Sequence, residues 1–302
     1  MEMIEQNSLF IPLENEQVLH LRHIFNPKKK GDAVFLLHGA VENGKIFYTE
    51  SNKGFAPFLA EQGYQCFVAD LRGRGQSLPK ISSSSYYGQT EAILEDIPTM
   101  LNFIKAQTGH FPKFWVAHSW GGVLLNSFLA RYPEHIQYVS ACGYFGTKRS
   151  LFNNHPSKLL QANLIWYTLA PLLSKRKGYL DARKLKWGSD NETVKSHYQS
   201  MQWAKKKPWV DSDDGFDYAS AIENLELPPI LHIAGAKDKA LAQPVDIKAF
   251  INESGKGVQE LRVYGKKHGH KIDYDHINML TSRHAHNDQF KELIEWFALY
   301  RV

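Results

Sequence analysis

A short apolar run that ends at a serine and two glycines constrains this chain more than any other feature. The run is Phe114-Trp115-Val116-Ala117-His118, and it is followed directly by Ser119-Trp120-Gly121-Gly122. Apolar residues then recur at helical spacing as far as Pro133. The pattern predicts a sharp turn from strand to helix, with Ser119 at its tip.

A serine at such a turn suits nucleophilic chemistry. Its hydroxyl becomes reactive when it is exposed, lies next to a base, and has backbone N–H groups nearby that stabilise an oxyanion. The glycines at 121 and 122 reduce crowding around a nucleophile whose backbone is strained. Ala117 stands where the G-x-S-x-G pattern usually has its first glycine, and it adds one methyl group. The simpler alternative is that Ser119 only caps the helix that follows.

Two further strand-like runs end in loops of distinctive composition. Residues 33–37 are apolar and lead into His38-Gly39-Ala40. The run that begins at Gly63 ends at Asp70, where a D-x-R-G-x-G-x-S loop extends to Ser77. Arginine and glycine together can also mark an RNA-binding segment, but a single occurrence directly after a strand argues against that interpretation.

These three motifs, in this order, resemble the α/β-hydrolase family, and the resemblance covers nearly the whole chain. It implies that Ser119 is the nucleophile and that the backbone N–H groups of Ala40 and Trp120 form the oxyanion hole. It implies no cofactor and no metal. In this family the nucleophile is followed along the chain first by an acid and then by a histidine.

The resemblance places the acid at Asp238. This residue follows the strand-like run 229–235 in a G-x-x-D turn. Some relatives carry the acid after an earlier strand, but the corresponding stretch here, 139–146, contains no carboxylate. The alternative is an aspartate that only shapes a turn.

The histidine is harder to choose, because five histidines crowd the segment after the last strand-like run, 261–264. They are His268, His270, His276, His284 and His286. The phrase Asp275-His276-Ile277-Asn278-Met279-Leu280 resembles the family's D-H-x-[DN]-M-L loop, which favours His276 as the base. His268 and His270 lie nearer the strand end and stay open as alternatives. An H-x-H pair can also bind zinc, but a hydrolase with an activated serine needs no metal.

The order of the apolar runs predicts the fold class. We expect eight strands, near residues 8–13, 17–25, 33–38, 65–70, 114–118, 137–142, 229–234 and 259–264, alternating with helices after the third. This order is typical of an α/β fold with a mostly parallel sheet, flanked by helices and opened by an antiparallel hairpin. Residues 147–224 break the rhythm where the family inserts a helical cap. The predicted core is therefore 1–146 and 225–302, and the predicted cap is 147–224.

Composition limits the other functions. The chain has 302 residues, 43% of them hydrophobic and 22% charged, with a formal net charge of +5. Its lysines fall in short runs, with no broad basic face and interleaved aromatics to suggest nucleic-acid binding. The sequence predicts no export signal and no membrane anchor. Cys66 and Cys142 lie in apolar runs, which favours buried free thiols and a reducing cytoplasm. The oligomeric state stays open.

Together these features predict a serine hydrolase that cleaves a carboxylic ester with an apolar acyl or alkyl group through an acyl-enzyme intermediate. His276 would move the proton and Asp238 would orient it. A serine nucleophile, in place of an aspartate, argues against the haloalkane dehalogenase and epoxide hydrolase branches. Thioesterase, aminopeptidase, carbon–carbon hydrolase and acyltransferase branches stay open. A catalytically silent ligand-binding protein with this fold is the alternative outside enzymes.

Overall fold

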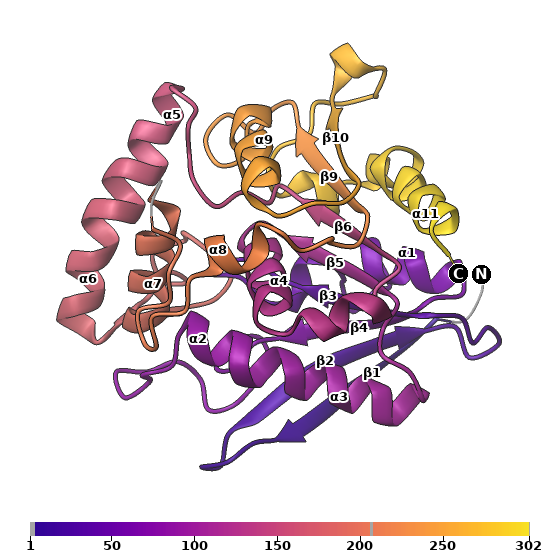
Figure 1. The fold of residues 1–302 in the computed structure, drawn as a ribbon, viewed down its shortest axis with the longest axis horizontal. Helices are drawn as coiled ribbons and strands as arrows, with labels where there is room; N and C mark the ends of the chain where they lie inside the picture. Colours follow the sequence, from indigo (N-terminus) through magenta and orange to yellow (C-terminus); the bar gives the residue numbers. More distant parts are fainter. Residues whose placement is uncertain (1–3, 206–207, 302) are drawn as a thin grey trace.

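Eight strands form a single sheet in the order β1-β2-β4-β3-β5-β6-β9-β10 (Figure 1). The computed structural model describes residues 4–205 and 208–301. β2 runs antiparallel to both β1 and β4, and the remaining neighbours are parallel. The strands are β1 (Glu5–Pro12), β2 (Val18–Phe25), β3 (Ala33–Leu37), β4 (Gln65–Asp70), β5 (Phe114–His118), β6 (Ala141–Phe145), β9 (Ile230–Gly235) and β10 (Gln259–Tyr264). The predicted eight-stranded, mostly parallel sheet is confirmed.

Helices connect the parallel strands. Those of the sheet region are α1 (Phe55–Glu61), α2 (Gln89–Glu91), α3 (Ile97–Thr108), α4 (Trp120–Arg131), α8 (Tyr218–Ile222), α9 (Pro244–Glu253), α10 (Asn278–Thr281) and α11 (Gln289–Leu299). None of the described helices is both long and apolar enough to cross a bilayer.

The period of two along each buried strand sorts its side chains into two cores. In β3, Phe35 and Leu37 face one side, where they join residues of α3 and α4. Val34 and Leu36 face the other side, where α1 and α11 supply the opposing residues. Because both faces are covered, β3 is apolar throughout instead of alternating with polar residues.

One predicted strand is misplaced. The expected strand at 137–142 begins four residues later, at Ala141, where it pairs with Phe114 of β5. Pro133 instead starts a 3₁₀ turn that extends to Tyr138, because proline is preorganised for the first turn of a helix. Tyr138 is apolar but 42% exposed, and it packs on Phe111 at the surface. The apolar residues before β6 therefore resembled a strand without being part of the sheet.

Most of the chain between β6 and β9 stands apart from the sheet. A helix begins with α5 (Pro156–Lys158), continues as a π-helical segment (Leu159–Leu169) and ends with α6 (Ala170–Lys177). A two-stranded ribbon, β7 (Tyr179–Leu180) with β8 (Glu192–Thr193), then leads into α7 (Val194–Ala204). α6 packs against α7, and the pair lies beyond one end of the sheet (Figure 1). The short ribbon was not predicted.

Candidate active site

Ser119 occupies the turn between β5 and α4. Its φ is +50°, in the left-handed region that non-glycine residues rarely adopt. Its backbone N–H donates to the carbonyl of Phe145 in β6 at 2.7 Å, which holds the strained turn against the sheet. A Cβ at Gly121 would lie 2.5 Å from the carbonyl oxygen of Leu37, so glycine is what lets α4 approach β3 this closely. The local geometry is the sharp turn that the sequence predicts.

Two backbone N–H groups flank this turn. Ala40 lies in the loop after β3, and Trp120 is the first residue of α4. Within residues 4–205 and 208–301, neither N–H donates to another protein group. Both residues line the same cavity as Ser119. Free donors at a helix N-terminus and a neighbouring loop suit a developing negative charge.

Asp238 and His276 lie together, and His276 lines the same cavity as Ser119. Asp238 follows β9, and its Oδ1 accepts from the N–H of Leu241 at 3.0 Å. Its other oxygen, Oδ2, lies 2.6 Å from Nδ1 of His276. This contact fixes the ring so that Nε2 is the nitrogen left to exchange a proton.

The electrostatics keep this pair in the form that a base needs. Burial would raise the pKa of Asp238, but His276 outweighs burial and holds that pKa below its usual range. Burial lowers the pKa of His276, Asp238 opposes the shift, and the nearby Lys148 adds to it. The imidazole is therefore neutral and the carboxylate ionised near neutral pH.

The loop around His276 is fixed by its own neighbours. Oδ1 of Asp275 accepts from the N–H of Asn278 at 2.7 Å, and Oδ1 of Asn278 accepts from the N–H of Asp275 at 2.7 Å. Met279 and Leu280 are fully buried and anchor the loop in the core. Gly146 lies beside the imidazole ring of His276. A Cβ at this position would lie 2.9 Å from Cε1 of the ring, so the close approach requires glycine.

The other candidate histidines lie elsewhere. His268 is exposed, and His270 packs on Tyr264 with 4.8 Å between ring centroids. Neither lines the cavity that holds Ser119. His284 and His286 fall in the 3₁₀ turn Arg283–Asn287, just before α11. Among the described residues, no three histidine, cysteine, aspartate or glutamate side chains are grouped to hold a metal ion.

Three residues near the nucleophile were not assigned from the sequence. The first two are His118 and Glu42. Nδ1 of His118 lies 2.7 Å from Oε2 of Glu42, and its Nε2 lies 2.8 Å from the backbone oxygen of His276. The same oxygen of Glu42 accepts from the N–H of Gly39 at 2.9 Å. Burial would raise the pKa of Glu42, but His118 outweighs it and lowers that pKa to about 2. The Glu42 carboxylate thus connects the loop that contains Ala40, through the His118 ring, to the backbone of His276.

The third is Lys148, three residues beyond β6. Its Nζ donates to Oγ of Ser119 at 3.0 Å. In the described part of the chain, the serine hydroxyl makes no hydrogen bond to His276. The sequence holds one signal for Lys148, which is its position shortly after the carboxyl end of β6. Because the carboxyl ends of parallel strands meet at one edge of the sheet, this position lies near Ser119 at the end of β5.

The cavity at this edge has a volume of about 660 Å³. Ser119 and His276 line it, although their residues are only 7% and 8% exposed. The segment between β6 and β9 contributes much of the wall, and most of that wall is apolar. The apolar lining residues from this segment are Leu151, Ile165, Trp166, Tyr167, Trp187 and Ala204.

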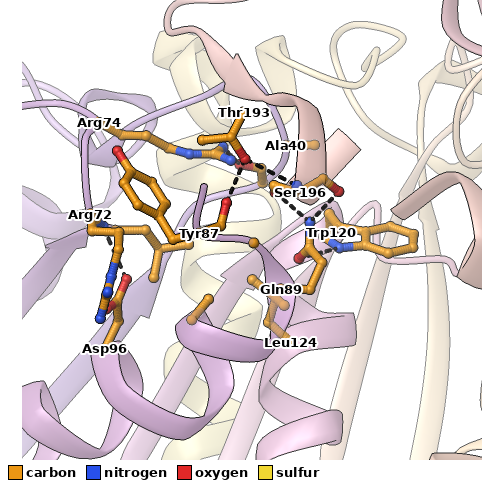
Figure 2. Close-up of a pocket in the computed structure, with 14 residues that line it drawn as sticks. Ala40, Arg72, Arg74, Tyr87, Gln89, Asp96, Trp120, Leu124, Thr193 and Ser196 are labelled. Atoms are coloured by element: carbon orange, nitrogen blue, oxygen red, sulfur yellow. Dashed lines mark hydrogen bonds and ion pairs between the residues drawn. The ribbon is translucent and has the colours of Figure 1, made fainter. Parts of the chain in front are cut away.

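A polar network ties the turn to the segment above it (Figure 2). The indole N–H of Trp120 donates to Oε1 of Gln89 at 3.1 Å, and Nε2 of Gln89 donates to Oγ of Ser196 at 2.7 Å. Close by, Oγ1 of Thr193 donates to the carbonyl of Tyr87 at 2.5 Å. These groups surround a cavity of only about 20 Å³, which is too small for an organic substrate.

The D-x-R-G-x-G-x-S loop is structural. Asp70 accepts from the N–H groups of Gly44 and Gln76, at 2.7 and 2.8 Å. Arg72 is bound to Asp96 (Figure 2). Arg74 pairs with Glu192 of β8. Both guanidinium groups are largely buried, so the loop offers no exposed arginine patch for RNA.

Comparison with known proteins gives the family. The model of the family described as "alpha/beta hydrolase fold" matches residues 32–269. The chain belongs to the α/β-hydrolase fold family. The match includes Ser119 and Asp238 and ends before His276, which lies in the loop just beyond it.

The curated relatives of this α/β-hydrolase match it over short segments only. A bifunctional epoxide hydrolase 2 from Sus scrofa is 29% identical over 111 residues, which are 37% of this chain and 18% of that protein. The chain covers a quarter or less of the length of the curated relatives it matches. This similarity therefore concerns one segment of much longer proteins.

Many solved structures share the fold over nearly the full length, and two of them serve as examples. A soluble variant of the monoglyceride lipase from Saccharomyces cerevisiae has a TM-score of 0.68 at 19% identity, covering 98% of this chain and 96% of that chain. The Pyrococcus furiosus esterase Pf2001 has a TM-score of 0.61 at 14% identity, covering 99% and 92%. At these identities the likeness shows the fold alone.

Proposed function

We propose that this α/β-hydrolase is a serine hydrolase that cleaves carboxylic esters with an apolar acyl or alkyl part. The observation that carries the proposal is the placement of an Asp238–His276 pair and a strained Ser119 around one cavity. Such an arrangement of base, orienting acid and nucleophile recurs in acyl-transfer enzymes on unrelated folds. The free N–H groups of Ala40 and Trp120 support the same reaction class.

In the proposed mechanism, Oγ of Ser119 forms a bond to the ester carbonyl carbon while Nε2 of His276 takes its proton. The N–H groups of Ala40 and Trp120 hold the tetrahedral oxyanion. His276 then returns the proton to the leaving alcohol, which leaves an acyl-serine that water hydrolyses by the same steps. The hydroxyl must turn from Lys148 toward His276, and such hydrogen bonds often tighten only when substrate is bound.

The segment 147–224 is the proposed cap. Its apolar wall over the cavity would exclude water and contact the apolar part of the ester. The names of the structural neighbours, a monoglyceride lipase and an esterase, support an ester substrate. The serine at the nucleophile position separates this chain from an epoxide hydrolase that uses aspartate. Cys66 and Cys142 are buried and free, which supports a reducing compartment such as the cytoplasm.

The test is turnover of nitrophenyl esters with short and medium acyl chains. Native protein should release nitrophenol and react with a fluorophosphonate probe, and Ser119→Ala should lose roughly 10⁴-fold or more in kcat. His276→Ala should be similarly inactive, while His268→Ala should keep native activity as a matched control. If native protein shows no turnover and no labelling, the hydrolase proposal fails and a silent ligand-binding protein becomes the better interpretation.

A further inference from the structure

Lys148 places a cation next to the proposed nucleophile, and the mechanism above does not use it. Its side chain extends from the loop after β6 until Nζ lies 3.0 Å from Oγ of Ser119. It lines the same cavity as Ser119 and His276. A charged amine next to Oγ of Ser119 would lie close to the substrate group that neighbours the scissile bond.

The charge of Lys148 has no paired carboxylate in the part of the chain that the structure describes. The two nearest carboxylates in electrostatic terms are already engaged, Asp238 with His276 and Glu42 with His118. Burial lowers the pKa of Lys148 against the pull of these carboxylates. The amine is partly buried. Without a paired anion such a charge is costly, and an anionic ligand would relieve that cost.

Lysines outnumber carboxylates along the cavity. Lys148 and Lys186 line it from two different segments, whereas Glu42 is its one carboxylate among the described residues. Lys45 lines it too, but its Nζ lies 3.4 Å from Oε1 of Glu50. Arg149 also lines it, but its guanidinium pairs with Glu253 and donates to backbone carbonyls, so it acts structurally. Lys148 is the cation of this set that contacts the nucleophile.

We propose that the preferred esters carry a carboxylate close to the scissile carbonyl, and that Lys148 binds this carboxylate. This inference rests on the proposed ester hydrolysis and specifies its substrate class. A reacting carbonyl carbon lies roughly 3 Å from the attacking oxygen, and a charge-assisted N–H···O bond spans about 2.8 Å. With Nζ at 3.0 Å from Oγ, the carboxylate must lie only a few bonds from that carbon. Short hemiesters of dicarboxylic acids fit this requirement.

The experiment compares matched esters on the native protein. Monoethyl succinate places the carboxylate on the acyl side, and butanoyl glycolate places it on the alcohol side. Each is paired with a neutral isostere in which an isopropyl group replaces the carboxylate. Native protein should prefer at least one anionic ester by roughly 10- to 100-fold in kcat/KM, chiefly through KM, because a hydrogen bond between charged groups is worth that much.

Two variants assign the preference to Lys148. Lys148→Met keeps the length of the side chain without its charge and should abolish the preference, while Lys148→Arg should retain part of it. Binding of succinate to Ser119→Ala, measured by calorimetry with and without Lys148→Met, checks the same contact without turnover. A cooperative thermal transition close to that of the native protein, followed by circular dichroism, shows that Lys148→Met is folded.

Three outcomes would overturn the inference while leaving ester hydrolysis intact. The first is that the native protein shows no preference for the anionic esters. The second is that this preference survives in Lys148→Met. The third is that Lys148→Met loses kcat/KM equally on the anionic ester and on its neutral isostere. The last outcome would make Lys148 a residue that acts on Ser119 itself. Failure of the proposed function looks different, because then no ester is cleaved and no probe reacts.

Discussion

At the scale of single residues, the contact between Asp238 and His276 decides which ring nitrogen can serve as the base. The carboxylate occupies Nδ1, and only Nε2 is left to exchange a proton. Asp238→Asn keeps the shape of the side chain but removes the negative charge that stabilises the imidazolium. We expect kcat/KM for a nitrophenyl ester to fall roughly 10³- to 10⁴-fold with an unchanged melting profile. A loss smaller than tenfold would contradict the assigned role.

Gly146 makes a second prediction possible, with a matched control. Gly146 and Gly215 both have left-handed φ values, +59° and +75°, but only Gly146 has a catalytic neighbour within reach of a Cβ. Both alanine variants should lose about 1 kcal/mol of stability in urea unfolding. Only Gly146→Ala should displace His276, and a shift on the order of 1 Å can lower kcat/KM about 100-fold. Equal activity of the two variants would show that the ring tolerates the extra methyl.

Individual residues also show where sequence reasoning reached its limit. Ser119, Ala40 and Trp120 could be predicted as site residues because each lies in a motif whose spacing is local. His276 was preferred over His268 and His270 only through the resemblance of its loop. Lys148 was not identified, because nothing in its local sequence tells that its side chain reaches Ser119.

At the scale of elements, an ion pair joins the loop after β4 to the ribbon of the proposed cap. Arg74 and Glu192 are both largely buried, and no other contact pairs a guanidinium with this carboxylate in the described chain. Arg74→Met would remove the counter-ion of the buried Glu192 carboxylate and leave it the N–H of Val41, which donates to Oε2 at 3.2 Å. This loss should cost about 3 to 5 kcal/mol. Denaturant unfolding measures this loss, and limited proteolysis shows whether residues 180–200 become accessible.

The double variant separates the pair from its surroundings. Arg74→Met combined with Glu192→Gln removes both charges, so it should be more stable than Arg74→Met alone. A double variant that is less stable by the sum of the two single losses would mean that the residues act independently. The misplaced start of β6 belongs to this scale too. The predicted strand 137–142 began at residues that belong to the surface turn Pro133–Tyr138 and its exit.

At the scale of the whole molecule, buried neutral histidines link stability to pH. Burial lowers the pKa of His232 in β9 to about 4, and it lowers the pKa of His23 in β2 to about 4 as well. The unfolded chain binds these protons at higher pH than the folded chain does. The contribution of these histidines to the free energy of unfolding is therefore fully present above pH 6.5 and is lost as the pH falls toward 4. For the fully buried His232 the loss at pH 4 is roughly 3 kcal/mol.

Urea unfolding between pH 7 and pH 4 tests this linkage. His232→Gln removes the titrating group and keeps a side chain that can donate to Gln259, the present partner of His232. Its stability should decline less steeply with acid than that of the native protein. His268→Gln, which removes an exposed imidazole, is the matched control. Equal slopes for all three proteins would show that burial of His232 does not control acid stability.

The sequence by itself determined the fold class and the strained turn at Ser119. Strand and helix periods, and the glycines that a tight turn requires, are properties of neighbouring residues, and they can be recognised without knowing where the chain goes. Only the tertiary structure decided that Asp238 contacts His276, that Glu42 contacts His118, and that Lys148 reaches Ser119. These pairs are brought together by the parallel order of the strands, which places the ends of distant segments at one edge of the sheet.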